Sequence, residues 1–405
     1  MTKGAKVIVA VIVVLILVWG GYAVYISSKN EISATNQTSL EPIKIGFIAP
    51  LTGGYSRIGL NAKAAAEIAV DEINESGGVL NRQIKLVAED GKCNANQSVT
   101  ASAKLINVDR VSVILGGACN DETSAAAPIA DASRVPMLSY CSTSDSHSAL
   151  GDFIFRNIPK ESSEIAYAAS YIATILKLDK VALVHEKSER GFKLGDTFDK
   201  NLTDSGGKIV ARETYDSKTS NLKLILSGVE NSRPDVLYFI GDFESSIAAI
   251  KQAASIKTRM QFFGTSSLDN ESLGEKLDKL GDGTMFSLNS TNSSSGFKQL
   301  MSAKLGFDKI LPCSNYAYDG VKILAGVMNQ AGTDGTSIKD ALYKVHYTGG
   351  LGQPTYDFDD NGDPSEPVYL IKVVKNGTAE IYSPDSIESA RPDSNEKATT
   401  TSTEN

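Results

Sequence analysis

Histidine is scarce in this 405-residue chain, where only His147, His185 and His346 occur. The chain also lacks a Gly-x-Ser-x-Gly elbow, a phosphate loop ending in Gly-Lys-Ser/Thr and a His-Glu-x-x-His pair. His185 closes an apolar strand, which favours a structural role over that of a catalytic base. These absences argue against an enzyme, and so few histidines argue against a metal site. The sequence gives no reason to expect a cofactor.

The chain also lacks a basic segment after its first residues and a cysteine near its start. The net charge is −8, and no Lys/Arg block follows the first residues, which argues against a nucleic-acid partner. No cysteine precedes Cys93, which excludes the lipidated N-terminal cysteine of a bacterial lipoprotein.

One long apolar run stands near the start of the chain. Residues 7–26 (VIVAVIVVLILVWGGYAVYI) carry no charge, enough for a helix to cross roughly 30 Å of hydrocarbon. Lys3 and Lys6 precede the run, so the chain after it should lie outside the cytoplasm. The alternative is a cleaved signal peptide with its cleavage site at Gly21 to Ala23. We favour a membrane anchor because of the length of the run, followed by a polar linker over 27–42. Residues 386–405 are almost without apolar side chains and are predicted to be disordered.

The stretch 111–131 (VSVILGGACNDETSAAAPIAD) is predicted to form a strand, a glycine turn and a helix. The first amides of a helix lack internal partners and the helix dipole is positive there, so a carboxylate could bind above Asn120. An ordinary turn that only caps its helix explains the same pattern.

Strand and helix patterns alternate along the rest of the chain. The first series of strands covers 43–51, 83–90, 111–115 and 135–140, and the second covers 181–186, 209–215, 235–241 and 261–264. Helical patterns separate them, as at 61–75 and 244–256. The alternation predicts an α/β protein with two mostly parallel sheets, each covered by helices on both faces. Two sheets imply two lobes, and ligands of such sheets bind beyond the carboxyl ends of the strands.

Several segments carry a family resemblance, among them IKIGFIAPLTGGYSRIG, GGACNDETSAAAP, VPMLSYCSTS and SNYAYDGV. Over residues 43–382 the chain resembles the leucine/isoleucine/valine-binding proteins, the solute receptors of amino-acid ABC importers. The resemblance implies the two-lobed type I periplasmic-binding fold with three hinge crossings, here near 157–162, 287–290 and 349–352. Lobe one would be 43–158 and 290–350, and lobe two would be 159–289 and 351–385.

Four cysteines allow three disulfide pairings. Cys93, Cys119 and Cys141 each follow a strand, so the pattern alone does not choose between them. The resemblance implies a Cys93–Cys119 bridge beside the ligand pocket. This leaves Cys141 and Cys313 as a second pair or as free thiols.

The resemblance also implies the lobe-one side of a pocket. Ile58 would lie over the ligand side chain, or would simply be a buried loop residue. Ala118 and Asn120 stand at the expected carboxylate site, where an amide can still donate a hydrogen bond. Ser142 and Thr143 match a segment that contacts the ammonium and the carboxylate, although a capped turn explains them equally well.

Lobe two departs more from the family pattern. Arg190 stands where an aromatic residue closes over the ligand, and Asp242 lies near another such position. Ser266 replaces an acidic partner of the ammonium, so Asp242 becomes the candidate for that role, with Asp269 behind it. Tyr318 matches a pocket tyrosine, or else it is a core residue.

Residues 357–364 (DFDDNGDP) match half of a calcium loop, but Val368 stands where a bidentate glutamate is required. A hairpin turn between strands at 353–358 and 367–374 explains Asn361 and Gly362 better.

Together these features predict an extracytoplasmic solute-binding protein. It would capture a small ligand, such as a branched-chain or other neutral amino acid, by hinge closure and offer it to an ABC permease in the membrane. The alternative is a ligand-sensing ectodomain for a signalling partner.

Overall fold

The computed structural model describes residues 19–22, 40–218, 221–306, 310–311 and 313–384. Of the predicted membrane segment 7–26, this range includes only residues 19–22, which are helical. Most of the predicted linker and the predicted tail 386–405 lie outside the described residues. No helix in the described ranges has both the length and the apolar character that a membrane span requires.

The first sheet is parallel throughout, with the strand order β2-β1-β3-β4-β5. Its strands are β1 (Ile43–Ala49), β2 (Ile84–Asp90), β3 (Val113–Leu115), β4 (Met137–Ser139) and β5 (Ile154–Arg156). Alternate residues of a strand face opposite sides, so Phe47 and Leu115 pack on one face while Ile48 and Ile114 pack on the other. The sheet therefore needs helices on both of its faces.

Helices cover each face of this sheet. The Phe47 face packs against α2 (Ser56–Glu75), α11 (Ser314–Ala331) and α12 (Gly335–Leu342). The Ile48 face packs against α3 (Ala95–Lys104) and α4 (Asn120–Ala132), with a π-helical turn, Leu105–Asp109, after α3. A further helix, α10 (Ser295–Leu305), buries Phe297 and Met301 against α2.

The second sheet has the order β14-β13-β10-β9-β8-β6-β7. Its strands are β6 (Lys180–Glu186), β7 (Lys208–Tyr215), β8 (Val236–Ile240), β9 (Gln261–Gly264), β10 (Met285–Asn289), β13 (Tyr369–Lys375) and β14 (Thr378–Ile381). The strands from β7 to β10 are parallel, and β13 and β14 are added antiparallel at one edge.

Helices also cover both faces of the second sheet. One face packs against α5 (Glu161–Thr174) and α6 (Glu189–Asp204). The other packs against α7 (Lys223–Glu230), α8 (Phe243–Ser255) and the short α9 (Leu273–Leu277). The described residues also contain three 3-10 turns, Asp145–Ala149, Ser266–Leu268 and Asp278–Gly281.

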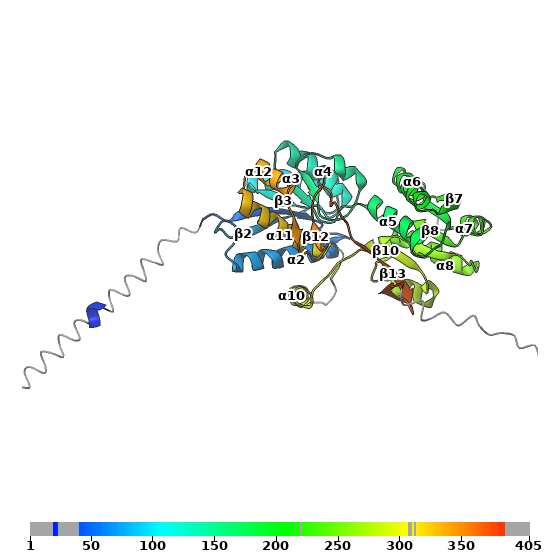
Figure 1. Cartoon of the computed structure of the whole chain (residues 1–405). Coiled ribbons are helices and arrows are strands. Elements are labelled where there is room, and N and C mark those ends of the chain that lie inside the picture. Colours follow the sequence, from blue (N-terminus) through cyan, green and yellow to red (C-terminus); the bar gives the residue numbers. More distant parts are fainter. Residues whose placement is uncertain (1–18, 23–39, 219–220, 307–309, 312, 385–405) are drawn as a thin grey trace, which may run out of the picture.

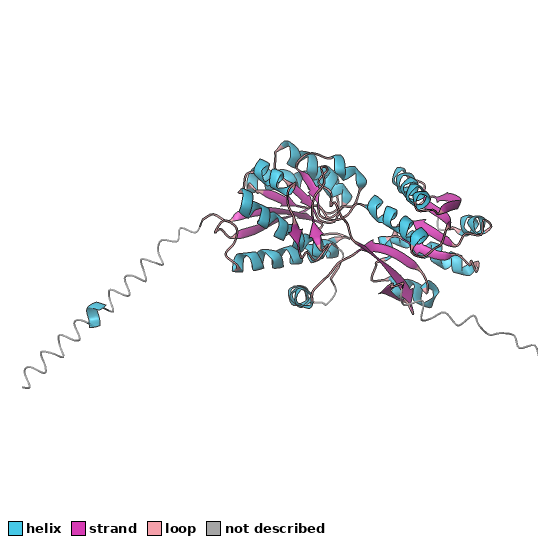
Figure 2. Cartoon of the chain, viewed as in Figure 1, coloured by secondary structure: helices cyan, strands magenta, loops and turns pink. Residues whose placement is uncertain are grey.

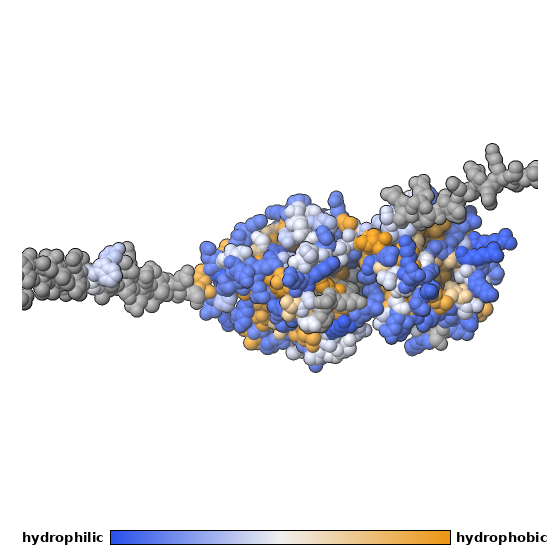
Figure 3. Space-filling view, turned by 90° about the horizontal axis from the view of Figure 1, so that it is seen from below, coloured by the Kyte–Doolittle hydropathy of each residue, from blue (hydrophilic) through white to orange (hydrophobic). Residues whose placement is uncertain are grey.

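The predicted architecture is confirmed: the molecule has two α/β lobes with mostly parallel sheets (Figures 1 and 2). In Figure 1 one lobe combines blue, cyan and orange segments, and the other combines green and red ones, so the chain passes between the lobes more than once. The space-filling view shows two rounded, largely hydrophilic bodies that meet at a narrower waist (Figure 3).

The predicted hairpin between 353–358 and 367–374 is confirmed only at its turn, where an antiparallel bridge joins Phe358 to Pro364 around Asn361 and Gly362. The pairing of its two strands is wrong. The short strand β12 (Thr355–Tyr356) pairs with β11 (Tyr347–Thr348), while β13 pairs with β10 and β14. The reason is burial, because Tyr356 and Phe358 pack into the core of the first lobe. The lobe boundaries stay a prediction, and this packing favours a third crossing later than 349–352.

Candidate functional site

A cavity of about 540 Å³ lies between the two lobes. This volume falls within the range of roughly 300–1,000 Å³ that is typical of small-molecule sites. The wall consists of residues at strand ends, helix starts and the first crossing: Asn120, Thr143, Pro159, Glu161, Glu164, Ile165, Arg190, Leu194, Ile240, Gly241, Asp242, Phe243, Thr265, Ser266, Ser267 and Asn289. The cavity thus lies beyond the carboxyl ends of parallel strands in both sheets, where α/β folds bind ligands.

A second cavity of about 460 Å³ adjoins the first, because Thr143, Ser266 and Asn289 line both. It extends past Tyr316 to the bridge between Cys141 and Cys313. The two cavities together leave space beside the polar site for an apolar ligand group.

Asn120 and Thr143 form the lobe-one wall of the first cavity, as predicted. Asn120 is the first residue of α4, and its Oδ1 accepts a hydrogen bond of 3.2 Å from the Ser144 amide. The Thr143 carbonyl accepts from the Glu161 amide at 3.0 Å, which ties this loop to α5. An amide side chain, a hydroxyl and the start of a helix therefore meet here, and all three can donate to an anion.

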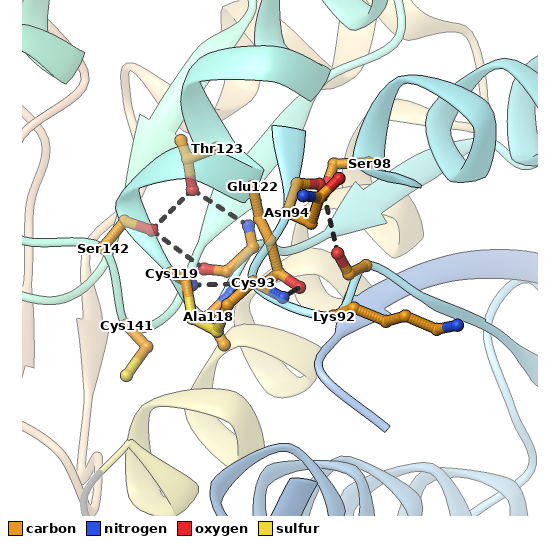
Figure 4. Close-up of a disulfide and its surroundings, with 12 residues drawn as sticks. Lys92, Cys93, Asn94, Ser98, Ala118, Cys119, Glu122, Thr123, Cys141 and Ser142 are labelled. Atoms are coloured by element: carbon orange, nitrogen blue, oxygen red, sulfur yellow. Dashed lines mark hydrogen bonds between the residues drawn. A yellow bond between two sulfur atoms is a disulfide. The ribbon is translucent and has the colours of Figure 1, made fainter. Parts of the chain in front are cut away.

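Ala118 and Ser142 lie behind this wall and are not among the residues lining the cavity. The amides of Ala118 and Cys119 donate to Oε2 of the buried Glu122, at 2.9 and 3.2 Å, and the Cys93 amide donates to Oε1 at 3.0 Å (Figure 4). Ser142 Oγ lies 2.6 Å from Thr123 Oγ1. The predicted anion donor at Ala118 is thus already engaged by a carboxylate of the chain itself.

The Glu122 carboxylate occupies the space that a side chain at position 91 would fill. A Cβ at Gly91 would lie 2.3 Å from Glu122 Oε1, so only glycine leaves room for the carboxylate. Burial raises the pKa of Glu122, although the amides of Cys93, Ala118 and Cys119 stabilise its charged form. Glu122 caps α4, as expected from its position in the first turn.

Both disulfides are present. Cys93 bridges to Cys119 with a Cα–Cα distance of 5.3 Å, and Cys141 bridges to Cys313 with 5.2 Å. The predicted Cys93–Cys119 pair is confirmed, and the leftover cysteines also pair. The first bridge joins the loop after β2 to the Asn120 loop, beside the Glu122 carboxylate (Figure 4).

Arg190 and Asp242 stand on the lobe-two wall. Arg190 is paired within its own lobe, because its Nε and Nη2 donate to Glu161 Oε2 at 2.9 and 2.7 Å. Asp242 is exposed and caps α8, with its Oδ1 accepting from the Ser245 amide at 2.7 Å. Each charged group thus already has a partner within the chain.

Glu164 is a charged wall residue that the sequence did not predict. It is 6% exposed, and its Oε1 accepts from the Ser266 amide at 2.7 Å and from Ser287 Oγ at 2.8 Å. Its Oε2 accepts from Ser266 Oγ at 2.6 Å. Burial raises the pKa of Glu164, and the serine donors act against this. The helical spacing did indicate that Glu164 is buried, since it shares a helix face with the buried Ala168 and Ile172.

Ile58 and Tyr318 do not join the other predicted residues. Neither lines the two interlobe cavities; Ile58 is half-buried in the first turn of α2. Tyr318 donates through its hydroxyl to Glu72 Oε2 at 2.5 Å and packs against Phe297. Residues two apart on a helix point in different directions, so Tyr316 reaches the cavity and Tyr318 does not.

Comparison with known proteins decides the family, because residues 42–378 match the family described as Periplasmic binding protein. The chain belongs to this family. Over 342 residues it is 25% identical to the leucine-, isoleucine-, valine-, threonine- and alanine-binding protein of Pseudomonas aeruginosa, covering 82% of this chain and 89% of that protein.

Solved structures show the same fold. The substrate binding protein of a branched-chain amino acid transporter from Streptococcus pneumoniae, in complex with isoleucine, is 24% identical, with a TM-score of 0.69 and coverage of 84% of this chain and 99% of that one. A benzoate-bound solute binding protein from R. palustris is 18% identical, with a TM-score of 0.66 and coverage of 84% and 95%. This periplasmic binding protein is accordingly a substrate-binding protein and not an enzyme, and its family is extracytoplasmic.

Proposed function

We propose that this protein captures a small amino-acid-like ligand, such as a branched-chain or other neutral amino acid, in the interlobe cavity and delivers it to an ABC permease. The observation that carries the proposal is the opposition of two walls across one cavity. Lobe one presents uncharged hydrogen-bond donors at Asn120 and Thr143, and lobe two contributes acidic side chains, among them Asp242 and Glu164. A zwitterion matches this division, because its carboxylate and its ammonium need opposite partners.

The same geometry supports hinge closure as part of the proposal. Residues from both lobes line the cavity, so a ligand that contacts both walls stabilises the closed form by its differential affinity. The crossings at 157–162 and 287–290, with a third between 359 and 368, would serve as the hinge. The closed form would then be the one that the permease binds.

We further propose that residues 7–26 anchor the protein to the outer face of the cell membrane. The linker over 27–42 would then hold the lobes near the permease.

The relatives support the amino-acid ligand, since the Pseudomonas aeruginosa protein is named for five neutral amino acids.

Ligand identification tests the proposal. Small molecules released from the purified protein by denaturation should include an amino acid when measured by mass spectrometry. Re-addition of that compound at about 100 times its dissociation constant should stabilise the protein by about 2.7 kcal/mol. Failure of every neutral L-amino acid to bind in a calorimetric screen would contradict the proposal.

A further inference from the structure

The carboxylate of Glu164 is unusual because it is buried without a cation. Among the described residues, no lysine, arginine or histidine side chain forms an ion pair with it. The guanidinium in the same cavity wall, that of Arg190, is paired with Glu161. All three contacts of the Glu164 carboxylate come from uncharged donors, namely Ser266 N–H, Ser266 Oγ and Ser287 Oγ.

These contacts orient the carboxylate but do not use all of its hydrogen-bond acceptor positions. A carboxylate offers about four acceptor positions. Oε1 uses two of them, for the Ser266 amide and the Ser287 hydroxyl, whereas Oε2 uses one, for the Ser266 hydroxyl. One position on Oε2 therefore remains, and Glu164 and Ser266 both belong to the cavity wall.

The free-energy cost of burying the Glu164 carboxylate suggests what binds at the remaining acceptor position. A buried carboxylate is expensive unless a positive charge and hydrogen bonds compensate it. Hydrogen bonds are present at Glu164, while the positive charge is not supplied by the described side chains. A ligand with an ammonium group would supply it on entering the cavity.

We propose that Glu164 binds the ammonium group of the ligand, with Ser266 and Ser287 holding the carboxylate in position. This inference rests on the proposed function and specifies its ligand class as carboxylic acids that carry a free amine. The acidic partner expected at Ser266 is thus replaced by a glutamate on α5, which Ser266 serves as a hydrogen-bond donor. Aromatic or keto acids without an amine would leave Glu164 uncompensated.

Asp242 is the rival for this role. Its side chain is exposed to solvent, and its Oδ1 is used to cap α8. An exposed carboxylate is stable without a ligand, so its presence alone does not call for a cation. Asp242→Asn is therefore the matched control, since it removes a charge from the same cavity.

The test uses the full chain and paired probes. L-leucine, L-valine and L-alanine are titrated calorimetrically beside the hydroxy acids in which a hydroxyl replaces the amine. Wild-type protein should prefer at least one amino acid over its hydroxy acid. Glu164→Gln keeps the shape of the side chain and removes its charge, so it should weaken amino-acid binding at least about 100-fold. Binding of the hydroxy acids should weaken much less, and Asp242→Asn should retain the amine preference.

The outcomes separate this inference from the proposed function. Amino-acid binding that survives in Glu164→Gln, or that is lost in Asp242→Asn instead, would overturn the role of Glu164 and leave the proposed function standing. Wild-type protein that binds only amine-free acids would overturn both. Glu164→Asp serves if the amide variant does not fold: retained preference for the amine supports the proposal, and preference equal to that for the hydroxy acid contradicts it.

Discussion

Arg156 Nε donates to Asp363 Oδ1 at 2.5 Å, although 207 residues separate the two in the sequence. Both side chains are buried, and Arg156 also donates to the Ser144 carbonyl and to Ser148 Oγ, each at 2.7 Å. Arg156 ends β5 just before the first crossing, and Asp363 precedes β13. The pair therefore fastens together two segments that lead from one lobe to the other.

Removal of the Asp363 carboxylate should lower the free energy of unfolding. Asp363→Ala leaves the buried guanidinium of Arg156 without its carboxylate, and such losses typically cost about 3–5 kcal/mol. Chemical denaturation of the variant and the wild-type protein measures the difference. The exposed Asp360 provides the control, because Asp360→Ala removes a charge from the same loop without removing a partner of Arg156. Equal stabilities of the two variants would contradict a fastening role.

His147 should make stability depend on pH. It is 4% exposed, and burial, assisted by the charge of Arg156, lowers its pKa from 6.5 to about 4. Between these values the unfolded chain binds a proton and the folded chain does not, so stability falls as the pH decreases from 6.5 to 4. The expected loss is about 3 kcal/mol from this group.

Urea denaturation at several pH values measures this effect. His147→Gln should flatten the slope between pH 6.5 and about 4. A slope that persists in His147→Gln would assign the effect to other groups.

The two disulfides should contribute differently to the stability of the folded protein. The Cys93–Cys119 bridge spans 26 residues and the Cys141–Cys313 bridge spans 172. Loop-closure entropy then predicts losses of about 3.5 and about 5 kcal/mol when each pair is replaced by serine. Non-reducing peptide mapping checks the pairing, and calorimetry checks the order. A smaller loss for the longer bridge would argue against the entropic account.

The N-terminal segment should stay with the mature protein. Residues 7–26 are long and uncharged enough to remain in the bilayer. Membrane fractionation followed by N-terminal sequencing should recover the protein in the membrane with its first residues intact. A mature chain that begins at Val24 would instead identify a cleaved signal peptide.

The sequence predicted the fold well because its strands are short apolar runs. KVALVHE becomes β6 and QFFG becomes β9, since both are buried on two faces and their patterns are uninterrupted. The end of the chain was harder to predict. Tyr356 and Phe358 look like part of the strand pair next to β13, and only the packing against lobe one separates them from it.

The site was predicted in part. Asn120, Thr143, Arg190, Asp242 and Ser266 all line the interlobe cavity, and their roles in ligand binding stay predictions. The resemblance supplied these positions, but it gave no sign of long-range contacts made by other residues.

Glu164 illustrates what was missed. An acidic residue in the first turn of a helix is usually explained by the helix dipole. Its partners Ser266 and Ser287 lie 102 and 123 residues away, so no local pattern reveals them.

The contacts of Glu122 have a kinetic consequence. Because Glu122 belongs to the chain itself, it orders the Ala118 and Cys119 amides independently of any ligand. A ligand arriving at Asn120 therefore meets a wall that is already rigid, and little loop entropy is lost on association. We expect capture to be limited by diffusion into the cavity, while escape waits for the lobes to separate. Differences in affinity among ligands should then appear as differences in residence time.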